Sequence, residues 1–330
     1  MAAKRALICG VSGQDGAYLA RLLLEKGYEV HGTSRDAEVN EFGRLRRLGV
    51  RERVQLHSMA LTEFRSVLRV IDRAQPDEVY NLAGQSSVGL SFEQPVETLE
   101  SVTAGTVNLL EAIRFTGRPI RFYNAGSSEC FGIRPAGQPA NEETPFRPRS
   151  PYAAAKAAAH FEVAIYREAY DLFACTGVLF NHESPLRPAR FVTRKIVAGA
   201  CRIARGSGER LELGNLGIRR DWGWAPEYVD AMWRMLQQPR PDDYVVATGE
   251  THSLEEFLEA AFRAVDLEWR DHVDVNPAFF RPADLPENRG DPAKAREVLG
   301  WEARTLMPEV VGRMVAAELA TLDGRAPDLS

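Results

Sequence analysis

A tyrosine and a lysine four positions apart, Tyr152 and Lys156, are the residues of this chain best suited to chemistry. Residues at this spacing lie on one face of a helix, although many ordinary helices contain such a pair by chance. Here the segment opens with Ser150, a suitable N-cap, and Pro151, which favours a first helical turn. Tyr152 is therefore expected near the positive end of the helix dipole, where a phenolate is stabilised. The pattern predicts a redox enzyme that uses a tyrosine.

Ser127 supplies a hydroxyl that we expect opposite the tyrosine, after a predicted strand over residues 121–125. Tyr152, Lys156 and Ser127 would remove a proton from a carbinol while its hydride passes to a nicotinamide cofactor. A phenol with an ordinary pKa near 10 must then lose about three pKa units, or roughly 4 kcal/mol. An exposed ion pair contributes only about 0–1 kcal/mol. We therefore expect desolvation, the helix terminus and the positive nicotinamide ring to lower the pKa together.

Glu129 follows two residues after this serine. Simple alcohol oxidation does not need a carboxylate there. A carboxylate can, however, remove the acidified proton beside a newly formed ketone and so drive the loss of water from the next carbon. The alternative is an ordinary surface glutamate at the end of a strand.

Glycines at positions 10, 13 and 16 follow a short apolar strand and precede a helical pattern. This is the context that a dinucleotide-binding turn requires, because the turn brings the pyrophosphate to the helix N-terminus. The spacing GxxGxxG is typical of extended short-chain dehydrogenases. The next strand ends in Ser34-Arg35-Asp36. Arg35 favours NADP, while Asp36 leaves NAD possible.

Strands and helices alternate along the first half of the chain. Strands are predicted at 6–9, 28–33, 54–57, 78–83 and 121–125, and the main helices at 18–26, 63–74, 101–115 and 151–170. This alternation predicts an α/β fold, a Rossmann-like doubly wound parallel sheet. We expect a dinucleotide-binding domain over residues 1–180 and a smaller C-terminal α+β substrate-binding lobe over 181–330, with part of 222–250 returning to the first. Closing helices are predicted at 291–299 and 306–322, and residues 324–330 read as a frayed tail.

Composition excludes several classes of protein. The 330 residues carry a net charge of −5, which gives no electrostatic reason to expect nucleic acid as a partner. No apolar run approaches the ~20 residues of a membrane span, and no signal peptide is evident. The four cysteines and six histidines do not cluster, so no metal site is predicted. A cytoplasmic protein with free thiols is the expectation.

Longer motifs make these patterns more specific. They include Gly-Val-Ser-Gly-Gln-Asp-Gly-Ala-Tyr-Leu (10–19), Val-Tyr-Asn-Leu-Ala-Gly-Gln-Ser (79–86), Pro-Arg-Ser-Pro-Tyr-Ala-Ala-Ala-Lys (148–156), Leu-Phe-Asn-His-Glu-Ser-Pro (179–185) and Arg-Arg-Asp-Trp-Gly (219–223). In these segments, and along nearly the whole chain, the sequence resembles the GDP-mannose 4,6-dehydratases, a nucleotide-sugar branch of the extended short-chain dehydrogenase/reductase family. Sugar epimerases of that fold usually lack the glutamate at position 129.

The resemblance implies a role for each catalytic position. Ser127 would orient the sugar hydroxyl and Tyr152 would take its proton, with Lys156 holding the cofactor ribose. Glu129 would deprotonate C5 and assist departure of the C6 hydroxyl as water. The hydride taken from C4 by NADP would return to C6, giving GDP-4-keto-6-deoxymannose without consuming an oxidant.

The resemblance also implies two sets of binding residues. The cofactor would contact Gly10, Gly13, Gln14, Asp15, Gly16, Arg35, Leu82, Ala83, Tyr152, Lys156 and His182, the last without a chemical step of its own. The GDP-sugar would contact Ser86, Asn181, Val192, Lys195, Arg220 and Arg281. Members of this fold commonly pair the helices at 101–115 and 151–170 across a two-fold axis, which implies a homodimer or homotetramer.

Some positions depart from the family pattern. Ala60 replaces an aspartate, Asp36 stands where a second arginine is common, and Asn124 and Gly126 precede the catalytic serine in place of glutamine and serine. A related enzyme for a different sugar nucleotide, whether a dehydratase, a 4-epimerase or a 4-ketoreductase, is therefore the alternative. A non-catalytic dinucleotide-binding protein is a second alternative.

Overall fold

A computed structural model describes residues 3–135, 137–280 and 283–330. Its centre is a seven-stranded parallel sheet with the order β11-β6-β5-β4-β1-β2-β3. The strands are β1 (Arg5–Cys9), β2 (Glu29–Ser34), β3 (Val54–Ser58), β4 (Glu78–Asn81), β5 (Arg121–Ala125), β6 (Ala174–Leu179) and β11 (Tyr244–Val246). Every residue of β4 and of β6 is buried, as expected for strands covered on both faces. The predicted doubly wound fold is confirmed.

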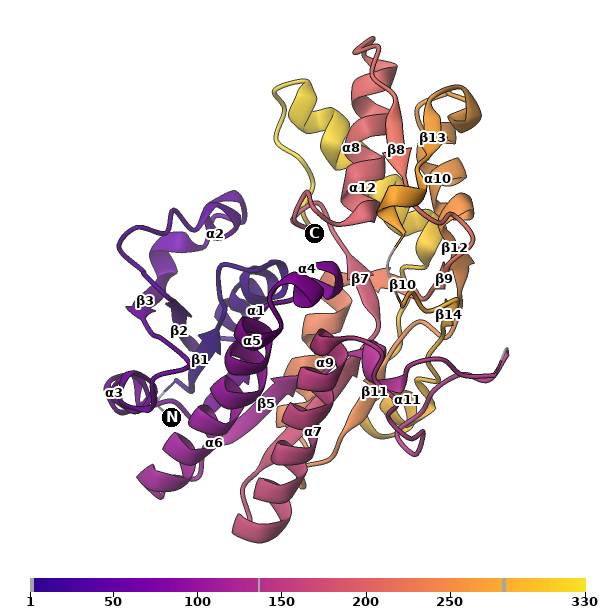
Figure 1. Cartoon of the computed structure of the whole chain (residues 1–330). Helices are drawn as coiled ribbons and strands as arrows, with labels where there is room; N and C mark the ends of the chain where they lie inside the picture. The colour runs from indigo at the N-terminus through magenta and orange to yellow at the C-terminus, as the bar shows by residue number, and fades with distance from the viewer. Residues whose placement is uncertain (1–2, 136, 281–282) are drawn as a thin grey trace.

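Helices cover both faces of this sheet (Figure 1). On one face α3 (Phe64–Ala74), α6 (Gly105–Thr116) and α7 (Pro151–Tyr170) share an apolar core with β1, β4 and β5. On the other face α1 (Gln14–Glu25) packs along α9 (Ala225–Leu236). Because β11 and α9 both join the large sheet, residues from 225 to 246 return to it after the chain has left for the smaller lobe.

The strand order reverses between β1 and β4, which are neighbours although two strands separate them in the chain. Chain connections leave the two strands in opposite directions at this point, so a crevice opens at their carboxyl ends. The glycine turn after β1 and the Leu82–Ser87 loop after β4 meet there. Helices α4 (Val88–Glu93), α5 (Pro95–Leu99) and the π-helical turn Glu100–Ala104 follow that loop.

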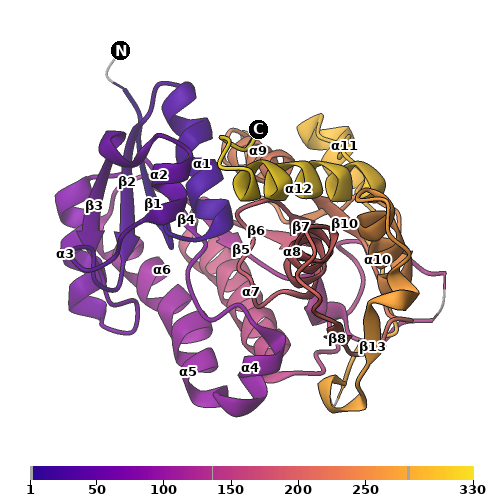
Figure 2. The ribbon, with the colours of Figure 1, turned by 90° about the horizontal axis from the view of Figure 1, so that it is seen from above.

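The smaller lobe has its own apolar core, formed by α8 (Val192–Ala204), α10 (Leu254–Arg263) and α12 (Met307–Leu322). Seen from above, these helices lie on the side of the molecule away from β1–β3 (Figure 2). Three small sheets complete the lobe: β7 (Asn181–Glu183) with β10 (Trp222–Trp224), β8 (Leu211–Leu213) with β13 (Val273–Val275), and β12 (His252–Ser253), β9 (Arg219–Arg220) and β14 (Glu287–Asn288). Helix α11 (Ala293–Leu299) and the short helix α2 (Gly43–Arg47) lie outside it.

Two predicted boundaries need correction. The first helix begins at Gln14 rather than at residue 18, because backbone geometry after the glycine turn starts it before any apolar residue. The C-terminal residues are not a frayed tail. Leu329 is buried in the core beside α1, its carbonyl accepts a hydrogen bond from Arg21 at 3.1 Å, and Trp224 donates to the Ser330 carbonyl at 3.2 Å.

Asp221 fixes the crossing between β9 and β10. It is completely buried, and its carboxylate accepts bonds from the backbone N–H of Thr248 at 2.9 Å, the Thr248 hydroxyl at 2.8 Å and the backbone N–H of Gly249 at 3.0 Å. The loop that carries Thr248 follows β11, so this carboxylate ties the smaller lobe to the edge of the large sheet.

Replacing Asp221 with alanine is expected to lower the free energy of unfolding by about 3 kcal/mol, because each buried donor left without a partner costs about 1–3 kcal/mol. Denaturant titration of the purified variant measures this loss. The exposed Asp72→Ala variant is the control and should change stability by no more than about 0.5 kcal/mol. Equal stability of the two variants would contradict the role assigned to Asp221.

Candidate active site

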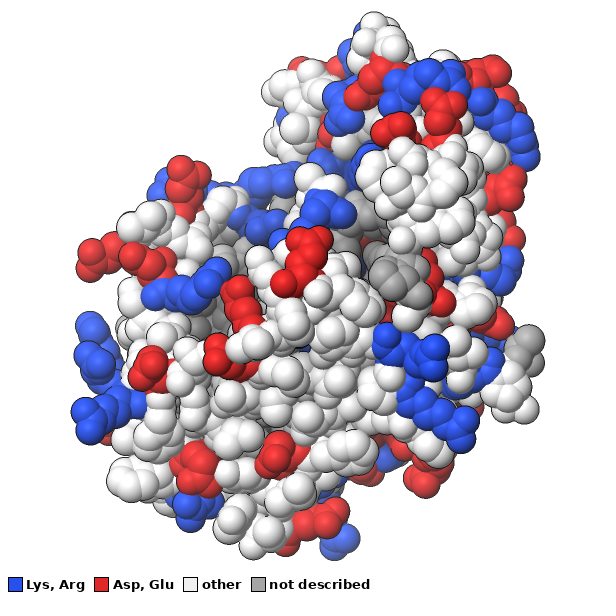
Figure 3. Space-filling model, viewed as in Figure 1, with Lys and Arg blue, Asp and Glu red and all other residues white. Residues whose placement is uncertain are grey.

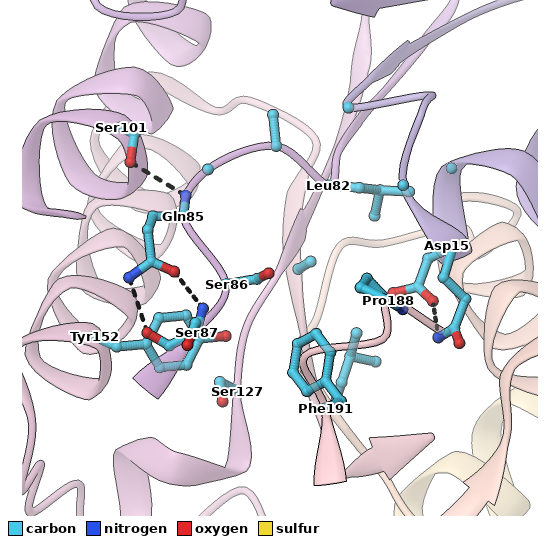
Figure 4. A pocket seen from close by; sticks show the side chains of 18 of the residues that line it. Asp15, Leu82, Gln85, Ser86, Ser87, Ser101, Ser127, Tyr152, Pro188 and Phe191 are labelled. Atoms are coloured by element: carbon cyan, nitrogen blue, oxygen red, sulfur yellow. Dashed lines mark hydrogen bonds between the residues drawn. The ribbon is translucent and has the colours of Figure 1, made fainter. Parts of the chain in front are cut away.

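A cavity of about 1030 Å³ occupies the crevice between the carboxyl ends of the strands and the smaller lobe. Ser127 and Tyr152 come to it from the large sheet and its helix α7, whereas Val192 and Arg220 come from the smaller lobe. In the close view, Tyr152 and Ser127 lie on the opposite side of the cavity from Asp15, with the ring of Phe191 between them (Figure 4).

The glycine turn is shaped for close backbone approach. Gly10 has φ +84°, and a Cβ built on it would lie 3.0 Å from backbone atoms of Leu82 and Ala83. A Cβ on Gly16 would lie only 2.4 Å from the Gly10 carbonyl oxygen. Gly13 is the N-cap of α1 and no side chain caps the helix there, so the first turn of the helix faces the cavity with its amides. These features fit the pyrophosphate of a dinucleotide.

A buried network holds the start of α1 against β7. Nε2 of His182 lies 2.9 Å from Asp15 Oδ2, and its Nδ1 lies 2.7 Å from the Phe180 carbonyl oxygen. The side chain of Gln14 donates to the His182 carbonyl at 3.2 Å and accepts from the Ser184 hydroxyl at 2.7 Å. His182 therefore positions the first turn of the cofactor helix and is fully engaged in doing so.

The charges of Asp15 and His182 shift the pKa of each other's side chain. Burial disfavours the charged forms, but the charge and hydrogen bond of the imidazolium outweigh it for Asp15 and lower its pKa to about 2. In the same way burial opposes protonation of His182, while the Asp15 carboxylate raises the imidazole pKa above its ordinary value. The two form an ion pair below the raised pKa of His182.

At the end of β2 the side chains of Arg35 and Asp36 point to different surroundings. Arg35 lines the cavity, is 90% exposed and lies 3.8 Å from Glu97. The Asp36 carboxylate accepts bonds from the backbone N–H groups of Glu38 and Val39 at 2.9 and 3.2 Å. It stabilises its own loop, and it is not among the described residues that line the cavity.

The predicted serine, tyrosine and lysine meet at one wall. Lys156 is buried, its Nζ donates to the Ala125 carbonyl oxygen at 2.8 Å, and it lies 5.9 Å from the centre of the Tyr152 ring. Burial lowers the pKa of Lys156 to about 8. Ser127 follows β5, hydrogen-bonds Tyr152 and caps the 3-10 turn that carries Glu129 by accepting from the Glu129 N–H at 3.3 Å.

The pKa of Tyr152 differs from the expectation. Burial raises it above its ordinary range, and the hydrogen bond from Ser127 only partly offsets that effect. The expectation that desolvation helps to lower this pKa is wrong, because a low-dielectric site disfavours the phenolate. Positive charge close to the phenol acts in the required direction, as the hydrogen bond with Ser127 does.

Almost all predicted site residues line the same cavity. Those that line it are Gly10, Gly13, Gln14, Asp15, Gly16, Arg35, Leu82, Ala83, Ser86, Ser127, Glu129, Tyr152, Lys156, Asn181, His182, Val192 and Arg220. Lys195 is not among the described lining residues; its Nζ donates to the Glu212 carbonyl at 2.6 Å, because it projects from α8 toward β8. Arg281 lies outside the described residues.

Several lining residues were missed by the motifs. Arg187 is mostly buried, lies 3.2 Å from Glu183 and stacks on Phe191 at 3.9 Å, and its charge acts to lower the pKa of Tyr152. Arg190 donates to the Ser86 hydroxyl at 3.1 Å. The only sequence signal of Arg187 and Arg190 is proximity to the Asn-His-Glu-Ser-Pro segment. Arg44, which the sequence places downstream of the second strand where it could reach a phosphate, also lines the cavity and donates to the Ser12 carbonyl at 3.0 Å.

Comparison of the sequence with known families and with individual proteins indicates the same family in each case. Residues 7–314 match the family described as GDP-mannose 4,6 dehydratase. The chain is 49% identical over 326 residues to GDP-mannose 4,6 dehydratase 1 of Arabidopsis thaliana. This match covers 96% of this chain and 90% of the relative. It is 46% identical over 345 residues to GDP-mannose 4,6-dehydratase of Sinorhizobium fredii, covering 97% of this chain and 98% of the relative.

Comparison of structures gives the same fold. UDP-glucose 4-epimerase of Thermus thermophilus, solved in complex with NAD, superposes with a TM-score of 0.83 at 28% identity. The match covers 94% of this chain and 97% of the epimerase. The glycine turn of this chain fits a dinucleotide of the kind that this structural relative was solved with.

Replacing Gly16 with alanine is expected to weaken binding of the nicotinamide cofactor by roughly 5- to 150-fold. The turn would shift to relieve the overlap with the Gly10 carbonyl, and returning it to the binding geometry would cost the overpacking energy of about 1–3 kcal/mol. Titration calorimetry with NADP measures the change. Gly312→Ala is the matched control, since a Cβ there meets nothing within 4 Å on helix α12. Unchanged affinity in the Gly16 variant would contradict this view of the turn.

The Asp15–His182 pair predicts how stability varies with pH. Asp15, whose folded pKa is lowered from 3.8 to about 2, contributes stability above pH ~4 that disappears as the pH falls toward 2. His182, whose folded pKa is raised from 6.5, contributes fully below that value and loses its contribution as the pH rises through the folded pKa. The pair is therefore strongest near pH 5.

Urea titrations of wild type and His182→Asn across pH should show this window. We expect a difference in unfolding free energy on the order of 2 kcal/mol near pH 5 that shrinks toward pH 8. His272→Asn, outside the network, is the control. A difference that is the same at every pH would mean that the two side chains do not form an ion pair.

Proposed function

The chain belongs to the GDP-mannose 4,6-dehydratase family, a family of hydro-lyases, and on that premise we propose that it converts GDP-mannose to GDP-4-keto-6-deoxymannose with NADP. The observation that carries the proposal is the meeting of Ser127, Glu129, Tyr152 and Lys156 at one cavity with the glycine turn. A reductase or an epimerase needs the serine, the tyrosine and the lysine but has no use for the glutamate.

The cofactor would lie along the turn from Gly10 to Gly16, with its ribose at Lys156. NADP rather than NAD is favoured because Arg35 and Arg44 border the cavity at the end of β2, whereas the Asp36 carboxylate is occupied by its own loop. When bound, NADP accepts the hydride from C4 of the sugar and returns it to C6, so no net oxidation occurs.

Tyr152 would accept the proton of the C4 hydroxyl, which Ser127 orients by a hydrogen bond. Burial raises the pKa of Tyr152, so the phenol stays protonated until positive charge lies close to it. Lys156, with a pKa near 8, remains mostly protonated at pH 7 and supplies part of that charge.

Glu129 would act after the ketone has formed at C4. The ketone acidifies the C5 proton, the carboxylate removes it, and the same residue returns a proton to the departing C6 hydroxyl. Placement on the short turn that Ser127 caps would hold this carboxylate on the same wall as the group that orients C4.

The nucleotide would lie toward the smaller lobe. Arg220, which is buried and lines the cavity, suits the diphosphate because guanidinium groups bind phosphate oxygens in pairs. Asn181 borders the same region, and Arg281 would add a second cation. Val192 and Lys195 begin α8 and would approach the guanine, Lys195 after its bond to the Glu212 carbonyl is exchanged.

We also propose that two copies pair through α5, α6 and α7. Val96, Leu99, Phe115, Phe161 and Ile165 project from these helices and are exposed, at 66%, 45%, 69%, 55% and 51%. The surface over these helices is mostly free of charge in the space-filling view (Figure 3).

No described helix has the length and apolar character of a membrane span. Four buried, unpaired cysteines favour a cytoplasmic location.

Purified protein mixed with GDP-mannose, first alone and then with NADP or NAD, tests the function. Mass spectrometry should show loss of one water from the sugar nucleotide, with no net change in the redox state of the nicotinamide. An unchanged GDP-mannose, together with turnover of another nucleotide sugar, would overturn the substrate assignment. Tyr152→Phe should abolish conversion, and retained conversion would exclude the tyrosine as the proton acceptor.

Replacing Glu129 with glutamine separates a dehydratase from a reductase or epimerase. Water loss should slow by about 10²–10⁴-fold, the usual contribution of a general acid or base. Hydride transfer from C4 should still occur, so enzyme-bound reduced nicotinamide should accumulate and be visible by its near-ultraviolet absorbance. Full turnover by this variant would exclude the dehydratase mechanism.

A further inference from the structure

Asn288 belongs to the smaller lobe, but its side chain bonds to the catalytic turn of the large one. The residue lies on β14 and is completely buried. Its amide Nδ2 donates a hydrogen bond to the Ser128 hydroxyl oxygen at 2.8 Å. Because a buried amide is costly unless it is hydrogen-bonded, this bond fixes where the side chain lies.

A neighbouring arginine determines which way the amide faces. Arg134 Nη2 lies 3.4 Å from Asn288 Oδ1, and the same guanidinium donates to the carbonyls of Gln138 at 2.6 Å and Arg289 at 3.0 Å. A guanidinium only donates, so the amide oxygen must face Arg134. The amide NH₂ group is then directed at Ser128.

Ser128 stands between the two residues that act on the sugar, Ser127 and Glu129. The turn that carries them is held internally by the bond from the Glu129 N–H to Ser127 Oγ at 3.3 Å and by the bond from the Cys130 N–H to the Ser127 carbonyl at 3.1 Å. These bonds set the shape of the turn. The bond from Asn288 sets its position relative to the smaller lobe.

The same segment also holds the cation proposed to bind the diphosphate. Arg220 is paired in register with Asn288 between β9 and β14. Its guanidinium donates to the Leu285 carbonyl at 2.7 Å and to Asp284 at 2.9 Å. Residues 284–288 therefore hydrogen-bond Arg220 through Asp284 and the Leu285 carbonyl, and the catalytic turn through Asn288.

We propose that Asn288 is a positioning residue that keeps Ser127 and Glu129 at a fixed place relative to a sugar whose diphosphate lies at Arg220. The inference rests on the proposed function, because it assumes that Glu129 acts on the sugar. Water loss depends directly on the place of Glu129, whereas hydride transfer loses only part of the orientation that Ser127 gives C4, since Tyr152 and Lys156 sit on α7 and need no contact with β14. The water-loss step should therefore be slowed more than hydride transfer. A displacement of about 1 Å at a reacting group costs up to 100-fold in rate.

The test replaces Asn288 with leucine, which keeps a similar volume without the amide, and approaches the bond from its other end with Ser128→Ala. Each variant should lose about ten- to hundredfold in kcat for water loss, with KM for GDP-mannose and Kd for NADP within about threefold of wild type. Reduced nicotinamide should accumulate during turnover.

The double variant should be no slower than the slower single one, because both changes remove the same bond. Asn141→Ala, which replaces an exposed asparagine, is the control and should behave as wild type.

Wild-type kcat in both variants, or a fall in kcat without accumulated reduced nicotinamide, would overturn the positioning role. Should Asn288→Leu fail to fold, Ser128→Ala alone decides between these outcomes. A wild-type chain that does not remove water from GDP-mannose would instead overturn the proposed function, and this inference with it.

Discussion

The burial of one ammonium group organises the catalytic wall. Lys156 reaches the carbonyl of Ala125, the last residue of β5, at 2.8 Å. A buried cation is stable only where acceptors meet it, so the lysine fixes the start of α7 against the end of β5. Ser127 follows that strand by two residues, and Tyr152 precedes the lysine by one helical turn. Thus the hydrogen bond from Lys156 to the Ala125 carbonyl also places Ser127 beside Tyr152. The carboxyl end of β5 in the parallel sheet is the rigid element that positions both.

The smaller lobe is joined to this edge by polar side chains as well as by apolar packing. Asp221 bonds the loop after β11, His182 bonds the first turn of α1, and Asn288 bonds the turn after β5. All three are buried. His182 lies on β7, Asp221 lies between β9 and β10, and Asn288 lies on β14. Hydrogen bonds have strict geometry and a high penalty when broken in the interior. They therefore specify one relative placement of the two lobes, where an apolar interface alone would tolerate sliding.

Much of this arrangement could be predicted from the sequence, and the exceptions have physical causes. The strand at 121–125 and the helix at 151–170 have the predicted bounds, because their apolar periodicity and the Ser150-Pro151 start are local signals. The glycine turn and the four residues proposed for catalysis, which line one cavity, could be picked out because their chemistry requires particular residue types at particular spacings. Arg187 and Asn288 were not, since the groups on which they act lie far away in the sequence: Tyr152 for one, Ser128 for the other. Nothing local distinguishes a buried asparagine from an exposed one. Lys195 was placed at the substrate by resemblance, whereas its side chain reaches the Glu212 carbonyl.

The raised pKa of Tyr152 constrains how the proton can leave the sugar. A helix N-terminus contributes about 0.3–1 kcal/mol, and a single lysine beside a phenol that burial disfavours as an anion does not make up the roughly 4 kcal/mol needed for a free phenolate at pH 7. A neutral phenol cannot accept a proton, so the phenolate has to form when further positive charge, such as that of an oxidised nicotinamide, lies beside the ring. The C4 hydroxyl becomes acidic as its hydride departs, so its proton passes to that phenolate in concert with the departure. Burial then serves specificity, because water that enters the cavity without the oxidised cofactor meets a neutral hydroxyl rather than a reactive anion.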